Sequence, residues 1–280
     1  MLVELAVGDA YGAGFEYAPD SLIQTENTAT HYVQHPRHHG IRPGMYTDDT
    51  QMSLAIAESL VSGERWTPQN LAECFVAVFH RDPREGYAGG FYALLQEIRS
   101  GTDLLDRIRP DSDKSGAAMR ATPLGVLPSA GQVAECCRVQ AMLTHNTPDG
   151  IGAAQAAALA AHYFLYRLGP KERLGLFLEG QVPGPWSVPW IGKVGPKGWM
   201  SVRAAITAVV RNDRLSALLK DCVAFTGDVD TVATIALATA SCCDEYEQDL
   251  PAELIAGLEN GPYGRDYLAA LNERLLALVR

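Results

Sequence analysis

Apolar residues recur at helical spacing along most of the chain after residue 50. This spacing predicts helices rich in Ala, Leu, Val and Ile over residues 51–62, 68–81, 88–99, 129–144, 150–168, 200–211, 213–224, 231–243 and 264–279. Glycine and proline interrupt the pattern between these ranges, for instance at Gly63, Pro83 and Pro170. No run alternates between β-branched and polar residues. The sequence therefore predicts an all-α protein, and the lack of a break in composition favours one domain over residues 1–280.

The N-terminal segment predicts a tightly packed helix crossing. A short apolar lead, residues 1–8, runs into small residues at positions 8, 10, 12, 13 and 14. The glycine spacing does not match a dinucleotide-binding fingerprint, and small residues suit a close approach of two helices. Glu16 follows directly and is a candidate pocket residue. The alternative for Glu16 is an exposed acid at a helix end.

Residues 17–45 predict a loop, because Pro19, Pro36 and Pro43 interrupt any helical pattern. The segment also holds four histidines: His31, His35, His38 and His39. We expect a solvated loop over a pocket. A transition-metal patch is the alternative.

The composition is that of a globular protein, with 47% hydrophobic and 20% charged residues among 280. A net charge of −10 argues against nucleic-acid binding through a basic surface, although a local basic pocket for a phosphate or one extruded nucleotide is compatible with it. The six cysteines form no Cys-x-x-Cys motif, and most lie in apolar runs, as thiols of a reducing compartment do. There is no signal-peptide pattern and no stretch of about 18 apolar residues, so we expect a cytoplasmic protein without a membrane span.

Two acidic stretches, roughly 180 residues apart, are the strongest candidates for chemistry. Residues 46–50 and 226–231 each place two Asp and at least one Thr directly before an Ala-rich apolar run. Asp and Thr there most often serve only as helix caps. One cap needs one acceptor, however, whereas each stretch offers two carboxylates and a hydroxyl. If the two helix starts meet, four Asp share one pocket and require a counter-charge. Hard divalent cations take such oxygen ligands, so we favour a binuclear metal site.

Two glycine-rich stretches are candidate ligand loops. Residues 82–90 place glycines directly before a helix, where backbone N–H groups can bind a phosphate. A plain turn between helices is equally compatible with that stretch. Residues 112–125 combine small residues with Lys114 and Arg120, which can meet anionic oxygens. For Arg120 we expect a buried structural ion pair rather than a direct role in catalysis.

Two further segments are candidate pocket walls. Residues 144–149 bring His145 and Asn146 ahead of an Ala-rich helix, although a lone His is usually a structural residue. Residues 181–199 are rich in Pro, Gly and Trp and form either a lid or a surface wrap.

Taken together, these motifs resemble those of the ADP-ribosylglycohydrolase family, hydrolases similar to dinitrogenase reductase-activating glycohydrolase. The resemblance covers nearly the whole chain in the family's order: Gly8-Asp9-Ala10-Tyr11-Gly12 with Glu16, Thr47-Asp48-Asp49-Thr50, Gly86-Tyr87-Ala88-Gly89, Gly116-Ala117-Ala118-Met119-Arg120, Thr144-His145 and Gly227-Asp228-Val229-Asp230-Thr231. Each motif is weak alone, and the ordered set is specific. It implies a compact orthogonal helical bundle with a central site for two Mg²⁺ or Mn²⁺ ions.

The resemblance also implies roles for individual residues. The metal ligands would be Thr47, Asp48, Asp49, Asp228, Asp230 and Thr231. Glu16 would lie beside the metals as a ligand or a gate. ADP-ribose would be held by Gly86, Tyr87, Ala88, Gly89, Ser115, Gly116, Met119 and His145, together with Glu16. Many relatives have Asn where this chain has Ser115, so an amide contact there would be shortened or lost.

The implied reaction is hydrolysis of the bond between the anomeric carbon of ADP-ribose and a modified side chain, with ADP-ribose as product. Such a cleavage passes through an oxocarbenium-like state and needs a placed water. Glu16, Asp48 or Asp49 would accept the proton. ADP-ribosyl-arginine protein is the favoured substrate, and serine-linked, nucleic-acid-linked and small-molecule conjugates are alternatives. Two other classes stay open: a non-catalytic ADP-ribose-binding module and a metal-stabilised helical scaffold.

Overall fold

The computed structural model describes residues 1–279, which form 15 α-helices and two short 3₁₀ helices. The α-helices are α1 (Leu2–Ala13), α2 (Asp20–Glu26), α3 (Asp48–Ser62), α4 (Pro68–Arg81), α5 (Gly89–Glu97), α6 (Gly101–Arg107), α7 (Gly116–Met119), α8 (Ala130–Met142), α9 (Pro148–Leu165), α10 (Leu174–Glu179), α11 (Gly198–Arg211), α12 (Leu215–Ala224), α13 (Val229–Ala240), α14 (Ala252–Gly257) and α15 (Arg265–Leu276). The 3₁₀ helices are Thr122–Val126 and Lys171–Arg173. Strand-like pairing within residues 1–279 is limited to isolated bridges. The predicted all-α fold is confirmed.

All nine helices predicted from apolar spacing are present, and their ends differ from the prediction by at most three residues. The short helices α2, α6, α7, α10 and α14 were not predicted, because four to seven residues are too few to display a helical period. The prediction of an uninterrupted loop over residues 17–45 was wrong for this reason, since α2 lies within it.

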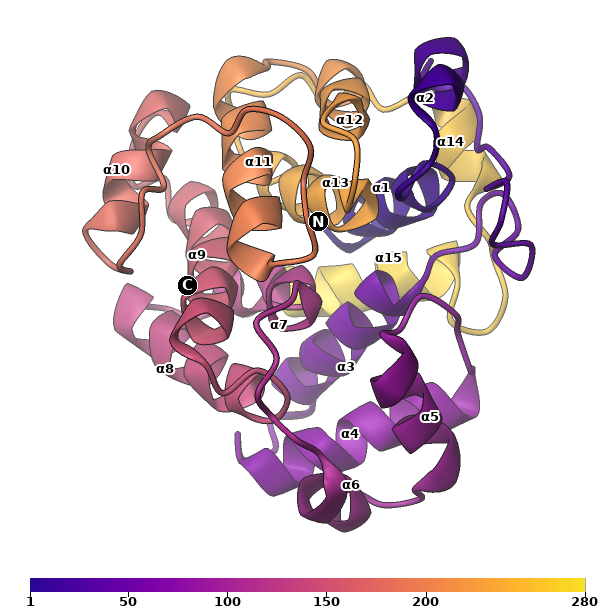
Figure 1. The fold of residues 1–280 in the computed structure, drawn as a ribbon. Helices are drawn as coiled ribbons and strands as arrows, with labels where there is room; N and C mark the ends of the chain where they lie inside the picture. Colours follow the sequence, from indigo (N-terminus) through magenta and orange to yellow (C-terminus); the bar gives the residue numbers. More distant parts are fainter. Residues whose placement is uncertain (280) are drawn as a thin grey trace.

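Helix α13 lies at the centre of the fold and is buried along its whole length (Figure 1). Its sequence has no charged residue after the first turn, so nothing along it requires contact with water. Helices α1, α3, α9, α11 and α12 pack around it. Helices α4, α5 and α6 lie farther out on one side, and α8 and α10 on another (Figure 1). The acidic first turn of α13 is therefore surrounded by the ends of other helices.

Helix α1 crosses α13 at two glycines. A Cβ atom on Gly8 would lie 2.5 Å from the carbonyl oxygen of Ala233, and one on Gly12 would lie 2.4 Å from the Cα of Asp230. Glycine permits this approach because it has no Cβ. The predicted close helix crossing is confirmed, and it determines where Glu16, just beyond the end of α1, is placed.

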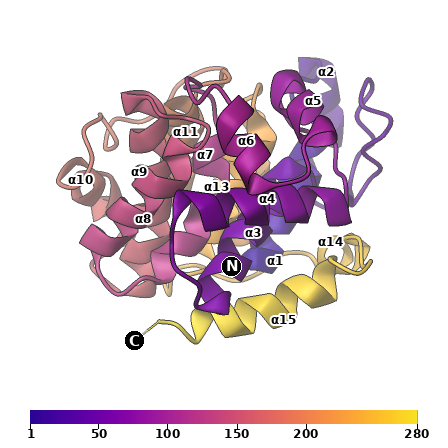
Figure 2. The same cartoon turned by 90° about the horizontal axis from the view of Figure 1, so that it is seen from below.

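Helix α15 packs against α1 and α3 and runs along the lower edge of Figure 2. The backbone N–H of Leu2 donates to the Asn272 side-chain oxygen at 3.1 Å, which joins the start of α1 to α15. Just before α15, the Glu259 carboxylate accepts a hydrogen bond from the Tyr46 N–H at 2.9 Å and pairs with Arg84. The first residue of the first acidic stretch is thereby fixed.

Candidate metal centre and ligand cavity

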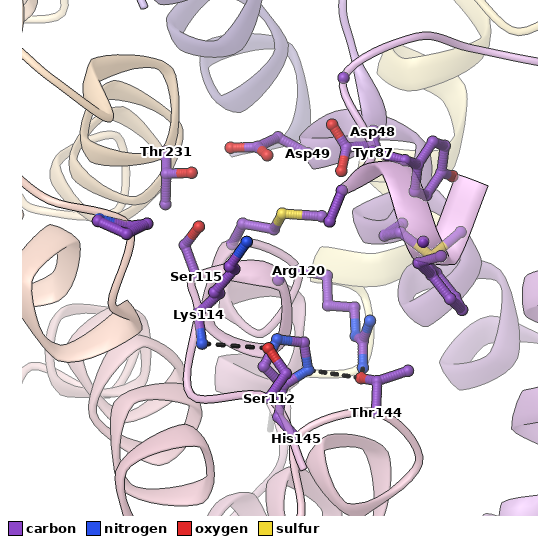
Figure 3. Close-up of a pocket in the computed structure, with 18 of the residues that line it drawn as sticks. Asp48, Asp49, Tyr87, Ser112, Lys114, Ser115, Arg120, Thr144, His145 and Thr231 are labelled. Atoms are coloured by element: carbon purple, nitrogen blue, oxygen red, sulfur yellow. Dashed lines mark hydrogen bonds between the residues drawn. The ribbon is translucent and has the colours of Figure 1, made fainter. Parts of the chain in front are cut away.

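A cavity of about 640 Å³ lies where the N-terminal ends of α3 and α13 meet. Figure 3 shows Asp48, Asp49 and Thr231 at one end of it and Arg120, Thr144 and His145 at the other. The residues that line it come from eight parts of the chain: Glu16, Tyr17, Asp48, Asp49, Met52, Gly86, Tyr87, Ala88, Gly90, Phe91, Leu94, Arg107, Ile108, Arg109, Ser112, Lys114, Ser115, Gly116, Met119, Arg120, Thr144, His145, Pro196, Asp228, Asp230 and Thr231. The two acidic stretches therefore share one cavity.

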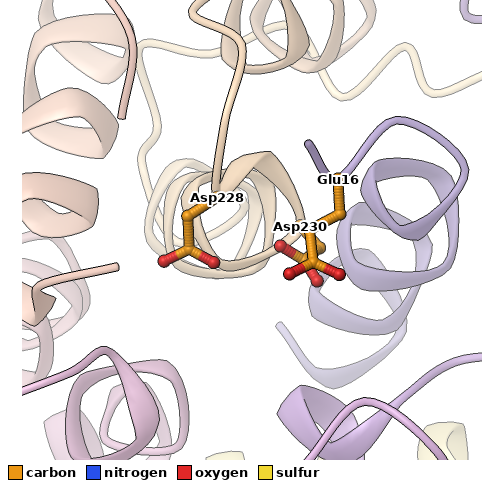
Figure 4. Close-up of side chains that lie close together, drawn as sticks. All are labelled: Glu16, Asp228 and Asp230. Carbon is orange, nitrogen blue, oxygen red and sulfur yellow. The ribbon is translucent and has the colours of Figure 1, made fainter. Parts of the chain in front are cut away.

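Three carboxylates gather at the start of α13 (Figure 4). Glu16, Asp228 and Asp230 each offer an oxygen, and these three oxygens lie within 4.8 Å of one another. Such spacing could hold one metal ion. Asp228 is further held by Ser201, whose hydroxyl donates to its carboxylate at 2.8 Å.

The turn that carries Asp228 is fixed by its backbone. Gly227 has a φ of +94°, and a Cβ there would lie 1.9 Å from the carbonyl oxygen of Val194. Val194 bridges both sides of that glycine, because its N–H donates to Thr226 at 2.9 Å and its carbonyl accepts from Asp228 at 3.2 Å. The Pro- and Trp-rich segment 181–199 is thus joined to the site at Val194.

The start of α3 is organised by Asp9 of α1, for which the sequence suggested no role of its own. The buried Asp9 carboxylate accepts from the hydroxyl of Thr47 at 2.7 Å and from the hydroxyl of Thr50 at 2.6 Å. It also accepts from the backbone N–H groups of both threonines at 2.9 Å. Asp9 therefore caps α3 from another helix and leaves Asp48 and Asp49 free to face the cavity.

A glycine also determines the position of Asp48. Gly86 has a φ of +111°, and a Cβ there would lie 2.2 Å from an oxygen of the Asp48 carboxylate. The neighbouring Tyr87 donates its hydroxyl hydrogen to Gln51 at 2.6 Å, which ties the loop to α3. Only a residue without a side chain lets the loop lie against this carboxylate.

The acids of the site have no lysine or arginine partner within residues 1–279, although Nδ1 of His38 lies 4.0 Å from the Glu16 carboxylate. Among residues 1–279, no Lys or Arg forms an ion pair with any of the six acids Asp9, Glu16, Asp48, Asp49, Asp228 and Asp230. Burial, and after it the charge of neighbouring acids, raises the pKa of Asp48, Asp49 and Asp230 well above its ordinary value. One oxygen of Asp49 is buried with no hydrogen-bond partner within the same residues. A divalent cation would supply both the missing charge and the missing partner, so the residues present fit such an ion.

Glu16 is the most exposed acid of this group, and burial followed by the charges of Asp228 and Asp9 raises its pKa to about 7. The loop that carries the four histidines contacts Glu16. His35 is buried, accepts at Nδ1 from the N–H groups of Arg37 and His38 at 3.1 Å, and bonds through Nε2 to the Glu16 carbonyl at 2.9 Å. The expectation of a fully solvated loop was wrong for His35, because its ring supplies the hydrogen bonds that this turn needs.

The far wall of the cavity is built on Arg120. This side chain is fully buried and forms no ion pair with any other residue of 1–279. It donates from Nε to the Gln140 side chain at 2.6 Å and from Nη2 to the Thr144 hydroxyl at 2.8 Å. Its guanidinium also lies 4.6 Å from the centre of the Phe75 ring. The predicted ion pair was wrong: neutral acceptors and an aromatic face take the place of a carboxylate.

Basic residues also line the cavity. They are Arg107, Arg109 and Lys114, and Arg107 pairs with Glu97. Of these, only Lys114 was a candidate from the sequence. Acids and bases therefore share the lining of one cavity, which suits a ligand that carries both hydroxyls and phosphates.

Most of the predicted site residues line the cavity, and Thr47, Gly89 and Asn146 do not. Thr47 is buried behind Asp48 with its hydroxyl bonded to Asp9, and Gly89 lies outside the lining while the adjacent Gly90 is within it. Tyr17, Phe91, Arg109 and Pro196 line the cavity and were not predicted, because no local pattern distinguishes them from surface residues.

Comparison with known proteins identifies a family. The model of the ADP-ribosylglycohydrolase family matches residues 1–280, so the chain belongs to this family of enzymes. ADP-ribosylhydrolase ARH3 of Danio rerio is 31% identical over 174 residues, which are 59% of this chain and 46% of that protein. ADP-ribosyl-[dinitrogen reductase] glycohydrolase of Rhodospirillum rubrum is 29% identical over 174 residues, which are 60% of this chain and 57% of that protein.

More distant similarities agree. ADP-ribosylarginine hydrolase Tri1 of Serratia proteamaculans is 24% identical over 173 residues, covering 59% of this chain and 46% of that protein. The matched regions thus span about half the length of the curated relatives. A solved structure described as an ADP-ribosylglycohydrolase-related protein complex superposes with a TM-score of 0.77 at 24% identity, over 100% of this chain and 96% of the other, which shows the fold. Among residues 1–279, none of the helices has the length and apolarity needed to span a lipid bilayer.

Proposed function

We propose that this protein uses two divalent cations, Mg²⁺ or Mn²⁺, to remove ADP-ribose from modified protein side chains, and that ADP-ribosyl-arginine is its substrate. The observation that supports the proposal most directly is the sharing of one cavity by Glu16 and the acids of both stretches, without a Lys or Arg partner within residues 1–279. An acidic cluster of this kind is unfavourable without bound cations.

The proposed metal ligands are Asp48 and Asp49 from α3 and Asp228, Asp230 and Thr231 from α13, with Thr47 behind them. When bound, divalent cations supply Lewis acidity and orient hydroxyl and water oxygens. Glu16 is the proposed proton acceptor, because it is the most exposed acid of the site and lies beside Asp228 and Asp230. Asp48 and Asp49 are the alternatives for this role.

The ADP-ribose unit would extend from the acids toward the basic residues of the lining. Gly86 and Ala88 offer a wall with little side chain beside the ribose, and Ser115 and Gly116 form the opposite wall. The diphosphate would lie nearer Lys114 and Arg109. The modified side chain would enter beside Glu16 and Tyr17, at the acidic end.

The choice of arginine rests on two relatives. One is named for the hydrolysis of ADP-ribosylarginine and another for the removal of ADP-ribose from dinitrogen reductase. The relatives named ARH3 are similar to the same degree, so conjugates with other linkages belong in the same assay. We further propose that residues 1–280 act as one domain and that the protein works in the cytoplasm, in keeping with six free cysteines.

The test is release of free ADP-ribose from ADP-ribosyl-arginine protein and, in parallel, from ADP-ribosyl-serine peptide. Each substrate is assayed with Mg²⁺, with Mn²⁺ and with EDTA. Asp48→Asn and Asp230→Asn should each lower the rate by about 100-fold or more, since each removes a charge that the cations need. Asp20→Asn, an exposed carboxylate of α2, is the matched control and should leave the rate unchanged.

Tight ADP-ribose binding without release from either substrate would contradict the hydrolase and favour a binding module. Release from the serine peptide alone would keep the reaction and replace the substrate.

A further inference from the structure

Three side chains form a chain of hydrogen bonds behind the far wall of the cavity (Figure 3). Arg120 donates from Nη2 to the Thr144 hydroxyl oxygen at 2.8 Å, and that same oxygen lies 2.6 Å from Nδ1 of His145. All three residues are buried, with 1%, 5% and 7% of their surfaces exposed. The chain ends at the cavity, because His145 lines it.

The direction of these hydrogen bonds follows from the chemistry of the donors. A guanidinium has donors only, so Arg120 cannot accept the hydroxyl hydrogen of Thr144. Within residues 1–279, the other polar atom bonded to that hydroxyl is Nδ1 of His145. The hydroxyl hydrogen finds an acceptor among these contacts only when it points to Nδ1, and in that arrangement Nδ1 is the acceptor. A neutral imidazole that accepts at Nδ1 carries its proton on Nε2.

The ring is held neutral and in a fixed place. Burial and the nearby charge of Arg120 lower the pKa of His145 to about 3. On its other side, a Cβ on Gly116 would come within 2.9 Å of Cε1 and 3.2 Å of Nε2, so the glycine lets this edge of the ring reach the cavity. No protein atom within the described part of the chain accepts a hydrogen bond from Nε2.

We propose that Arg120 and Thr144 are positioning residues that hold His145 as the Nε2–H tautomer, so that its ring presents a hydrogen-bond donor to an acceptor oxygen of the ADP-ribose unit. The ligand part of this inference rests on the proposed function. It also accounts for a buried arginine without a carboxylate partner: a carboxylate beside Thr144 would compete for the hydroxyl hydrogen and free the ring to take the other tautomer. The neutral acceptor Gln140 and the aromatic face of Phe75 satisfy Arg120 without that competition.

The test combines a tautomer measurement with ligand binding. Long-range ¹⁵N–¹H correlation spectra of histidine-labelled protein report which ring nitrogen is protonated, and the His145 signals are assigned by their loss in His145→Gln. Thr144→Val keeps the side-chain shape and removes the hydroxyl, and Thr144→Ser restores it. We expect Nε2–H in the wild type and in Thr144→Ser, and a substantial Nδ1–H population in Thr144→Val.

Calorimetric titration with ADP-ribose then measures the consequence. Thr144→Val should bind about tenfold more weakly, the worth of one net hydrogen bond, and Thr144→Ser should bind like the wild type. A merely structural role would lower stability without moving the tautomer. The metal-dependent rise in Tm is measured alongside and should be the same in all three proteins, which shows that the acidic end is intact.

The outcomes separate the inference from the function on which it rests. A wild-type ring protonated on Nδ1, or an unchanged tautomer and affinity in Thr144→Val, would overturn the role of Arg120 and Thr144 while leaving the hydrolase standing. A wild type that shows Nε2–H but binds no ADP-ribose would overturn the ligand assignment and the proposed function together.

Discussion

Gly12 lies so close to Asp230 that a Cβ at position 12 would come within 2.4 Å of the Asp230 Cα. The contact joins the helix before Glu16 to the helix that carries the second acidic stretch. A methyl group there would push α1 away from α13, and overpacking of this kind costs about 1–3 kcal/mol. We therefore expect Gly12→Ala to lower the free energy of unfolding by that amount and to weaken Mn²⁺ binding about tenfold or more, since one ligand group moves.

Urea denaturation and a calorimetric Mn²⁺ titration measure the two effects of Gly12→Ala. Gly131→Ala is the matched control, because Gly131 is also helical and an added Cβ meets no heavy atom within 4 Å. The control should be as stable as the wild type or slightly more stable. Normal metal affinity in Gly12→Ala would show that the crossing does not position the site.

Asp9 is predicted to be essential for the start of α3. Asp9→Asn replaces one acceptor oxygen with an NH₂ group that faces the donors of Thr47 and Thr50. Hydrogen bonds to a charged group contribute about 1.5–3 kcal/mol each, so we expect a loss of about 2 kcal/mol or more in unfolding free energy, together with weaker metal binding. The comparison is Asp103→Asn. Asp103 is an exposed carboxylate of α6 that accepts from the Arg99 N–H and from the Ser100 hydroxyl, and its substitution should lower the unfolding free energy by about 1 kcal/mol or less. Equal losses in the two variants would refute a special role for Asp9.

Asp49→Asn should have opposite effects with and without metal. In EDTA the wild type keeps a buried carboxylate whose one oxygen has no partner within residues 1–279, beside other acids. Removing that acid should raise Tm, by about 2–4 °C for each kcal/mol gained. With Mn²⁺ the order should reverse, because the wild type gains binding energy that the variant has lost. Differential scanning fluorimetry measures all four values, and a variant less stable than the wild type in EDTA would argue against an unneutralised cluster.

The metal-free protein should lose stability as pH rises toward neutrality, in part through Glu16. The folded-state pKa of Glu16 is about 7, against an ordinary value of 4.5. Between these values the folded protein binds the proton and the unfolded chain does not, so this contribution to stability is present below about pH 4.5 and lost by about pH 7. Glu16→Gln removes it.

The measurement is the Tm difference between wild type and Glu16→Gln in EDTA, from pH 5 to pH 8. The Tm of the wild type should fall relative to that of Glu16→Gln as pH rises. His145 has the opposite sign, because its pKa is lowered and its contribution is lost as pH falls below about 6.5. Both proteins keep His145, so its effect cancels. A constant difference across the range would contradict the raised pKa of Glu16.

The sequence was sufficient where the determining pattern is local. Helical period located α3 and α13, and the small residues of α1 predicted its close crossing with another helix. The pairing of residues 46–50 with 226–231 was predicted from chemistry alone. Each stretch has more carboxylates than a helix cap needs, and together the two stretches can bind divalent cations. In these cases the residue types themselves, apolar, small or acidic, determine what must lie next to them.

The sequence was insufficient where a residue's partner is set by the fold. Asp9 bonds to Thr47 and Thr50 only because α1 lies against the start of α3. Arg120 finds Gln140 and Phe75 where an ion pair was expected, and nothing in its own segment specifies those neighbours. Such contacts are properties of the packing between helices, and they determine which polar groups are free to act.

The contact between α1 and α13 has a consequence for biosynthesis. Its two sides are roughly 220 residues apart, so a ribosome that adds about 5–20 residues per second leaves α1 without its partner for on the order of 10–45 s. During that time the apolar face of α1 stays uncovered, and it is a natural target for a chaperone that binds nascent chains. The acids of α3 are likewise synthesised long before those of α13. Metal uptake should therefore mark the end of folding rather than its beginning, and a ribosome-bound chain that stops before Asp228 should take up no tightly held ion.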